Sequence, residues 1–177
     1  MSFKSGFSLA GEGKLFENWI FSTPFTINGF SYGAILAFEE VLNSDNRIDT
    51  LQLFSPAFFQ TQKASYKKMQ LRYYKADPEA YEKAFLENVA YPSSYDLKPY
   101  YKKSTPKVLE TLLNYEWSGE KLQLLRDRGV KIEVYLGEVD KIIDAKACKE
   151  FFEPFAKVFY FKQCGHLLKG EKVESEN

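Results

Sequence analysis

The residues best suited to chemistry lie in one five-residue stretch, Gly29-Phe30-Ser31-Tyr32-Gly33. It follows a β-rich run at 25–28 and precedes an apolar run at 34–42 with the spacing of a helix. A strand, a G-x-S-x-G sequence and a helix in this order form the nucleophile-elbow pattern. The tight turn strains the serine backbone, and a side chain two positions away on either side would collide with it, so glycine is required there. Ser31 is therefore the predicted nucleophile; the alternative is a glycine-rich turn with an incidental serine.

Two later residues supply the partners that a nucleophilic serine needs. Asp140 follows a strong strand pattern at 130–136, and His166, the only histidine in the chain, follows another at 158–161. The carboxyl ends of parallel strands build the sites of α/β sheets, so the three side chains are expected to converge. The order serine, acid, histidine is also that of the elbow pattern. The chemistry predicted is attack of Ser31 on a carbonyl, with His166 moving the proton and Asp140 orienting the imidazole.

Other readings of these residues remain open at this stage. Glu138 and Asp144 are rival acids, but Asp144 is explained as a helix cap and Glu138 sits too close to its strand to turn back. A lone histidine is also often structural. Cys164 beside His166 lacks the spacing of metal ligands, and no second base is available to a cysteine nucleophile, so we expect neither a metal nor any other cofactor.

Attack on a carbonyl also requires donors for the developing oxyanion. The backbone N–H of Tyr32, just after the nucleophile, is one expected donor. The second should come from the loop after the first strand pattern, and Phe7 is the expected residue.

The elements that must position these groups alternate along the chain. Strand patterns at 1–9, 25–28, 48–54, 130–136 and 158–161 are interspersed with helical patterns, first at 15–20 and then at 34–42, 120–128 and after Asp144. Such alternation predicts an α/β protein with a mostly parallel sheet and helices on both faces. The polar tail 169–177 is expected to fray.

Residues 58–117 interrupt this rhythm with helical, aromatic-rich sequence, in which Asp77-Pro78 and Thr105-Pro106 are expected helix starts. We therefore expect a single domain whose core is 1–57 and 118–177, with 58–117 inserted as a helical cap. Within 60–107, ten basic side chains outnumber five acidic ones, although the whole chain has zero formal net charge. This excess indicates either a solvated helical surface or a docking patch for an acidic partner.

Composition narrows the remaining classes of function. Zero net charge gives no general attraction to nucleic acid or membrane surfaces, and no run approaches the roughly 20 apolar residues that span a bilayer. Two cysteines, Cys148 and Cys164, imply no disulfide framework, and no signal-like run follows Met1. The expected location is the cytoplasm.

Taken together, the motifs resemble the α/β-hydrolase superfamily, and more narrowly the small BioV-type pimeloyl-acyl carrier protein methyl ester esterases of biotin synthesis. The stretches that carry the resemblance are Phe3-Lys4-Ser5-Gly6-Phe7, Leu15-Phe16-Glu17-Asn18-Trp19, the elbow with Ala34, Leu53-Phe54-Ser55-Pro56, 129–134 and 161–168. The chain departs from larger α/β hydrolases in being short at its start and in reading Ser5-Gly6 where their oxyanion loop usually reads His-Gly.

The resemblance implies an α/β-hydrolase fold with Ser31, Asp140 and His166 as catalytic residues. It also implies hydrolysis of the methyl ester of a pimeloyl chain carried by an acidic acyl carrier protein. On that basis Lys68, Arg72 and Lys75 are expected to dock the carrier, and four aromatic residues are expected to line the acyl channel: Phe58, Tyr66, Tyr73 and Phe85. The alternatives are a carboxylesterase or thioesterase for small molecules, and a non-catalytic binding protein of the same fold.

Overall fold

A four-stranded parallel sheet forms the centre of the protein in the computed structural model, which describes residues 3–171. The strands lie side by side in chain order: β1 (Thr26–Phe30), β2 (Thr50–Phe54), β3 (Lys131–Gly137) and β4 (Lys157–Phe161). The near-continuous apolar runs of β2 and β3 suit strands covered on both faces. The parallel α/β sheet predicted from the alternation of patterns is confirmed.

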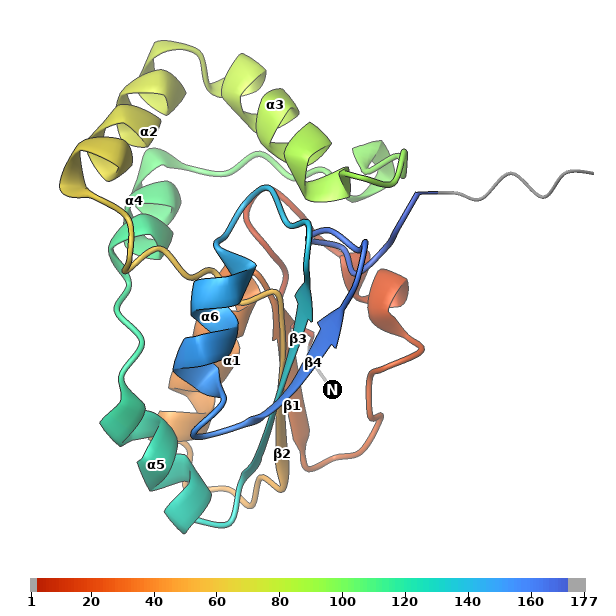
Figure 1. The fold of residues 1–177 in the computed structure, drawn as a ribbon, viewed down its shortest axis with the longest axis vertical. Coiled ribbons are helices and arrows are strands. Elements are labelled where there is room, and N and C mark those ends of the chain that lie inside the picture. The colour runs from red at the N-terminus through yellow and green to blue at the C-terminus, as the bar shows by residue number, and fades with distance from the viewer. Residues whose placement is uncertain (1–2, 172–177) are drawn as a thin grey trace, which may run out of the picture.

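Three helices cover one face of this sheet: α1 (Tyr32–Asn43), α5 (Gly119–Asp127) and α6 (Ala145–Phe152). Because the strands follow one another across the sheet in chain order, right-handed crossover connections all place their helices on the same face. Figure 1 shows these helices on the left of the sheet. Between them and the strands lies the larger core cluster, which includes Phe38, Leu125 and Phe152.

The opposite face carries a row of aromatic residues in register, one from each strand: Phe30, Phe54, Tyr135 and Phe159. The short 3-10 helix η1 (Glu12–Phe16) covers this row, and the Phe16 ring stacks on that of Phe54 with centroids 5.0 Å apart. Helices thus lie on both faces, although the second face is covered by a single 3-10 turn rather than by an α-helix.

The N-terminal predictions need correction. We expected a strand at 1–9, of which residues 1 and 2 lie outside the described range. The described part of this segment forms no strand: Lys4 makes an isolated bridge to Gly29, and the chain then leaves the edge of the sheet. The helix expected at 15–20 is the 3-10 helix η1, which ends at Phe16. Gly11, with φ of 77°, and the exposed Glu17 leave only Glu12–Phe16 between them, with two apolar side chains, which is too short to nucleate an α-helix.

The remaining helices lie beyond the carboxyl ends of the strands, at the top of Figure 1. They are α2 (Ala64–Ala76), α3 (Pro78–Ala90), η2 (Lys98–Tyr100) and α4 (Pro106–Asn114), and we call α2, α3 and α4 the cap helices. The expected caps form, since Asp77 accepts from the N–H of Ala80 at 3.0 Å and Thr105 accepts from that of Val108 at 3.3 Å. No helix within residues 3–171 has the length and apolar character needed to cross a membrane.

Candidate active site

Ser31 sits in a strained turn between β1 and α1. Its φ of 55° and ψ of −115° fall where L-residues are rarely found. The turn is tight because both neighbouring glycines pack against backbone. A Cβ on Gly29 would lie 2.2 Å from the carbonyl oxygen of Gly33, and one on Gly33 would lie 1.9 Å from that of Lys4. Only glycine fits at either position, so the local geometry is that of a nucleophile elbow.

His166 and Asp140 are brought together from the ends of different strands. The Nδ1 atom of His166 lies 2.6 Å from Oδ2 of Asp140, and both side chains are fully buried. The other carboxylate oxygen of Asp140 accepts the backbone N–H groups of Ile142 and Ile143, at 2.7 and 3.1 Å. These two bonds fix the carboxylate, which in turn fixes the imidazole ring.

The rival acids are engaged elsewhere. Asp144 accepts from the N–H of Ala147 at 2.9 Å and caps α6. Glu138 accepts from the N–H of Gln163 at 3.2 Å and is exposed. Neither bonds to the histidine in the described chain.

The histidine lies next to the elbow. Its ring centroid is 4.9 Å from that of Phe30, the residue before the serine, and its carbonyl oxygen accepts the Ser55 hydroxyl at 2.7 Å. Its Nε2 atom is buried and has no hydrogen-bond partner among the described residues, so it does not bond to the hydroxyl of Ser31 in this conformation. Catalytic hydrogen bonds of this kind are often long without substrate and tighten only when it binds.

The Ser5–Leu9 segment, which we call the oxyanion loop, packs directly on the elbow. A Cβ on Gly6 would lie 3.4 Å from the Cβ of Ser31. Among the loop and turn hydrogen bonds of the described chain, none is donated by the N–H of Phe7 or of Tyr32. The N–H groups of the two residues expected to stabilise the oxyanion therefore take part in none of these loop and turn bonds.

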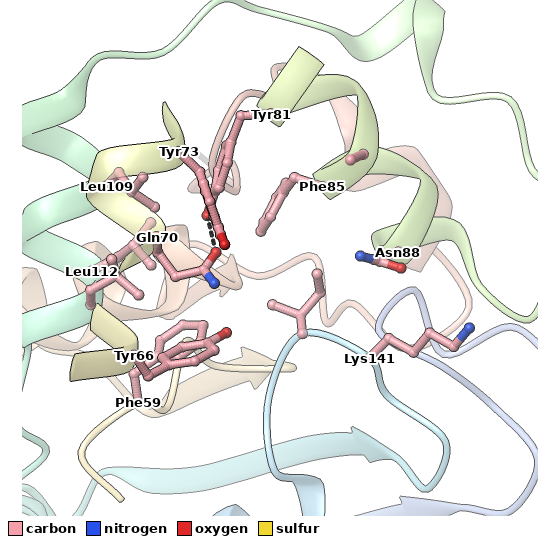
Figure 2. Close-up of a pocket in the computed structure, with 13 residues that line it drawn as sticks. Phe59, Tyr66, Gln70, Tyr73, Tyr81, Phe85, Asn88, Leu109, Leu112 and Lys141 are labelled. Atoms are coloured by element: carbon pink, nitrogen blue, oxygen red, sulfur yellow. Dashed lines mark hydrogen bonds between the residues drawn. The ribbon is translucent and has the colours of Figure 1, made fainter. Parts of the chain in front are cut away.

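A cavity of about 290 Å³ lies between the cap helices and the loop after β3. Figure 2 shows Tyr66, Tyr73 and Phe85 around it, together with Gln70, Asn88 and Lys141. Its volume is at the lower end of the range of about 300–1,000 Å³ typical of ligand sites. The lining includes neither Ser31 nor His166, and Ser31 is only 3% exposed.

Phe58 does not lie where we expected it. It is buried in the core, where its ring centroid is 5.4 Å from that of Phe151 on α6, and its neighbour Phe59 lines the cavity instead. Successive side chains of an extended segment point to opposite sides, and the sequence alone does not say which of two adjacent phenylalanines faces inward.

The three basic residues expected to dock a partner are all exposed on α2: Lys68, Arg72 and Lys75. None of them takes part in an ion pair within the described chain. Tyr73 and Met69, which are 52% and 38% exposed, share the same helix.

Both cysteines are free, and burial raises the pKa of each thiol. Within residues 3–171 there is no group of three or more His, Cys, Asp or Glu side chains arranged to hold a metal ion.

Sequence reasoning missed two groups near the site. Lys141 lies at the edge of the cavity with its Nζ 3.5 Å from the centroid of the Tyr91 ring, and its position beside Asp140 was the only available signal. Glu12 is fully buried on η1, although an acidic residue between two glycines is typical of an exposed turn.

Neither a protein-family model nor a curated protein sequence matches the chain. Solved structures do. A carboxylesterase structure from Nitrososphaera gargenis has 18% identity and a TM-score of 0.57, and the match covers 80% of this chain and 57% of that one. Naproxen esterase of Bacillus subtilis has 19% identity and a TM-score of 0.53, with 81% and 53% covered. A monoacylglycerol lipase of Paleococcus ferrophilus has 11% identity and a TM-score of 0.56, with 97% and 87% covered.

These matches, together with the parallel sheet, identify the class of fold: the chain has a shortened α/β-hydrolase fold. It spans little more than half the length of the first two of these structures. At such low identity the likeness extends to the fold and not to the activity.

Proposed function

We propose that this protein is a serine carboxylesterase that works through Ser31, His166 and Asp140. The 2.6 Å contact between His166 and Asp140, beside a serine held in a strained elbow, carries this proposal. A buried histidine oriented by a carboxylate that is itself fixed by two backbone N–H groups is preorganised to accept a proton from a nearby hydroxyl. The carboxylesterases among the structural neighbours support the same class of reaction.

The reaction then follows from the geometry. As Ser31 Oγ bonds to the carbonyl carbon of the ester, its proton passes to Nε2 of His166, and the N–H groups of Phe7 and Tyr32 stabilise the oxyanion. Collapse of this intermediate breaks the bond to the alkoxide, which takes the proton from His166 and leaves. Water attacks the acyl-serine by the same route and releases the carboxylic acid and the free serine. Asp140 keeps the imidazole in the tautomer with its proton on Nδ1 and stabilises the imidazolium.

For the substrate, we propose the methyl ester of a pimeloyl chain carried by an acyl carrier protein. The aromatic and aliphatic side chains in the cavity lining support an acyl substrate, and the unpaired cations on α2 support an acidic carrier. Since the cavity lining does not include the buried Ser31, the cavity would have to open toward the serine for the chain to reach it. Binding is therefore expected to involve movement of the cap helices.

The test is release of free carboxylate from methyl pimeloyl-carrier protein, with wild type and Ser31→Ala measured side by side. Hydrolysis by wild type alone is the expected result, because the alanine variant keeps the fold but has no nucleophile. Equal rates for the two proteins would contradict the role of Ser31.

A carboxylesterase or thioesterase for small molecules is the second candidate, and the small size of the cavity favours it. Wild-type activity on p-nitrophenyl acetate that requires Ser31, with none on the carrier-bound ester, would select it. A binding protein without catalysis would show neither activity and would fail to react with an active-site phosphonate.

A further inference from the structure

A buried carboxyl group, that of Glu12, lies against the oxyanion loop. Glu12 belongs to η1, has no exposed surface and takes part in none of the ion pairs of the described chain. Its Oε1 atom accepts the N–H of Gly6 at 2.7 Å, while Oε2 is buried without a partner. Burying a carboxyl that leaves one oxygen without a partner is costly, which calls for a reason to keep it there.

The bond from Gly6 fixes one of the two peptide planes that meet at that residue. The second plane, between Gly6 and Phe7, is fixed because its carbonyl oxygen accepts the N–H of Leu9 at 3.3 Å. The C=O and N–H of one trans peptide point in opposite directions, so this bond also sets the direction of the Phe7 N–H. Two hydrogen bonds, one of them accepted by Glu12, thus fix the two peptide planes that meet at Gly6, and the second of these planes contains the N–H of the expected oxyanion donor.

The same loop is also held by one of its own side chains, that of Phe7. The Phe7 ring packs between the cap helices, with its centroid 6.0 Å from that of Tyr74 and 5.2 Å from that of Phe85. The loop also packs closely against the elbow, because a Cβ on Gly6 would lie 2.9 Å from the Phe30 ring. Among the described residues, Glu12 is the only one whose side chain accepts the backbone N–H of Gly6.

We propose, on the basis of the esterase function proposed above, that Glu12 is a positioning residue that holds the oxyanion loop in its productive shape. In this protein the loop contains Ser5-Gly6, and the Glu12 carboxyl group on η1 holds it through the hydrogen bond from Gly6. Burial raises the pKa of Glu12, and hydrogen bonding, above all from the N–H of Gly6, offsets this only in part. Glutamine keeps an oxygen that can accept the Gly6 N–H, so it is a close substitute.

The experiment compares Glu12→Ala and Glu12→Gln with wild type, using p-nitrophenyl acetate. A donor to the oxyanion acts mainly in the transition state, so displacing it lowers kcat and leaves KM nearly unchanged. We expect Glu12→Ala to lose roughly tenfold to a hundredfold in kcat, somewhat less than the loss from removing a donor outright. Glu12→Gln, whose amide oxygen also accepts the Gly6 N–H, should stay within about threefold of wild type.

Leu15→Ala is the matched control, because Leu15 is a buried residue of the same 3-10 helix that does not contact Gly6 through a hydrogen bond. It should lower the melting temperature as Glu12→Ala does, yet retain kcat at a temperature where both proteins are folded. An equal loss of kcat in Leu15→Ala, a full kcat in Glu12→Ala, or no rescue by glutamine would each overturn the proposal.

Hydrogen exchange of the Gly6 amide gives a readout that does not need ester hydrolysis. We expect exchange to be roughly tenfold or more faster in Glu12→Ala than in wild type, and slow again in Glu12→Gln. Unchanged exchange in Glu12→Ala would show that Glu12 does not hold the loop. Absence of any hydrolysis that depends on Ser31 in wild type would instead contradict the proposed function, while the exchange result would still decide the role of Glu12.

Discussion

At the scale of single residues, the acid that partners His166 is distinguished by its second oxygen. Asp140 and Asp144 are four positions apart, and each accepts backbone N–H groups through its Oδ1 atom, but only Asp140 has its second oxygen against the histidine, 2.6 Å from Nδ1. Asp144 uses its carboxylate to begin α6. The same residue type therefore serves as a helix cap at one position and as a partner of the imidazole at the other.

Asp140→Asn tests this assignment. Oδ1 of the asparagine would keep the bonds from Ile142 and Ile143, which turns its NH₂ group toward Nδ1 of His166. The imidazole would then carry its proton on Nε2 and be unable to accept one from Ser31. We expect kcat for p-nitrophenyl acetate to fall by roughly 10³- to 10⁴-fold, with little change in melting temperature.

Asp144→Asn is the matched control, because asparagine is an equally good N-cap and the variant should retain full activity. The assignment of Asp140 would be wrong if Asp140→Asn kept its activity and either Asp144→Asn or Glu138→Gln showed the large loss of kcat instead.

At the scale of elements, the cap helices are tied together by one buried carboxylate. Glu82 on α3 accepts the hydroxyl of Tyr74 on α2 at 2.9 Å, the hydroxyl of Tyr101 at 2.5 Å and the N–H of Ser104 at 2.9 Å. Desolvation alone would raise its pKa, but these bonds outweigh it and lower the pKa below its usual value. The ionised form is therefore the one that the folded cap stabilises.

This predicts a pH-dependent contribution to stability. A carboxylate whose pKa is lower in the folded state stabilises the protein above the unfolded pKa of about 4.3, and that contribution is lost as the pH falls through the folded pKa. Glu82→Gln should lower the melting temperature at pH 7, and the difference from wild type should shrink below about pH 4. Thermal unfolding of both proteins between pH 3 and pH 7 measures this. A difference that stays constant down to pH 3 would mean that the ionised form has no special role.

Elements with strong local signals were predictable from the sequence. The elbow and the starts of α3 and α4 follow from residue types whose steric or capping preferences act within a few positions. The conformation of residues 5–20 could not be predicted from the sequence. It depends on the hydrogen bond between Gly6 and Glu12 and on packing against the aromatic row that this segment covers. Likewise, which of Phe58 and Phe59 enters the cavity is decided by packing against α6 and not by either residue type.

At the scale of the whole molecule, charge is unevenly distributed although the total is zero. The excess of five positive charges lies in residues 60–107, and Figure 1 shows the helices of this segment beyond the carboxyl ends of the strands. Lys68, Arg72 and Lys75 lie exposed within it. A surface of this sign favours encounter with an acidic partner and orients it toward the cap helices.

Charge reversal of these three residues to glutamate tests whether the surface is used. We expect the triple variant to lose most of its kcat/KM on methyl pimeloyl-carrier protein at low ionic strength, because steering by exposed charges is lost. The deficit should narrow as salt is raised toward 0.5 M, where the screening length falls to about 4 Å. Activity on p-nitrophenyl acetate should not change, since none of the three residues lines the cavity or contacts Ser31.

A second triple variant controls for the change in net charge. Reversing Lys14, Lys146 and Lys162 alters the total charge by the same amount at exposed positions outside the cap helices. If the carrier-bound ester responds to charge at one docking surface, this variant should keep nearly full activity on it. An equal loss in both triple variants would mean that only net charge matters, and an equal loss on the two substrates would mean that the cap substitutions damage the catalytic centre itself.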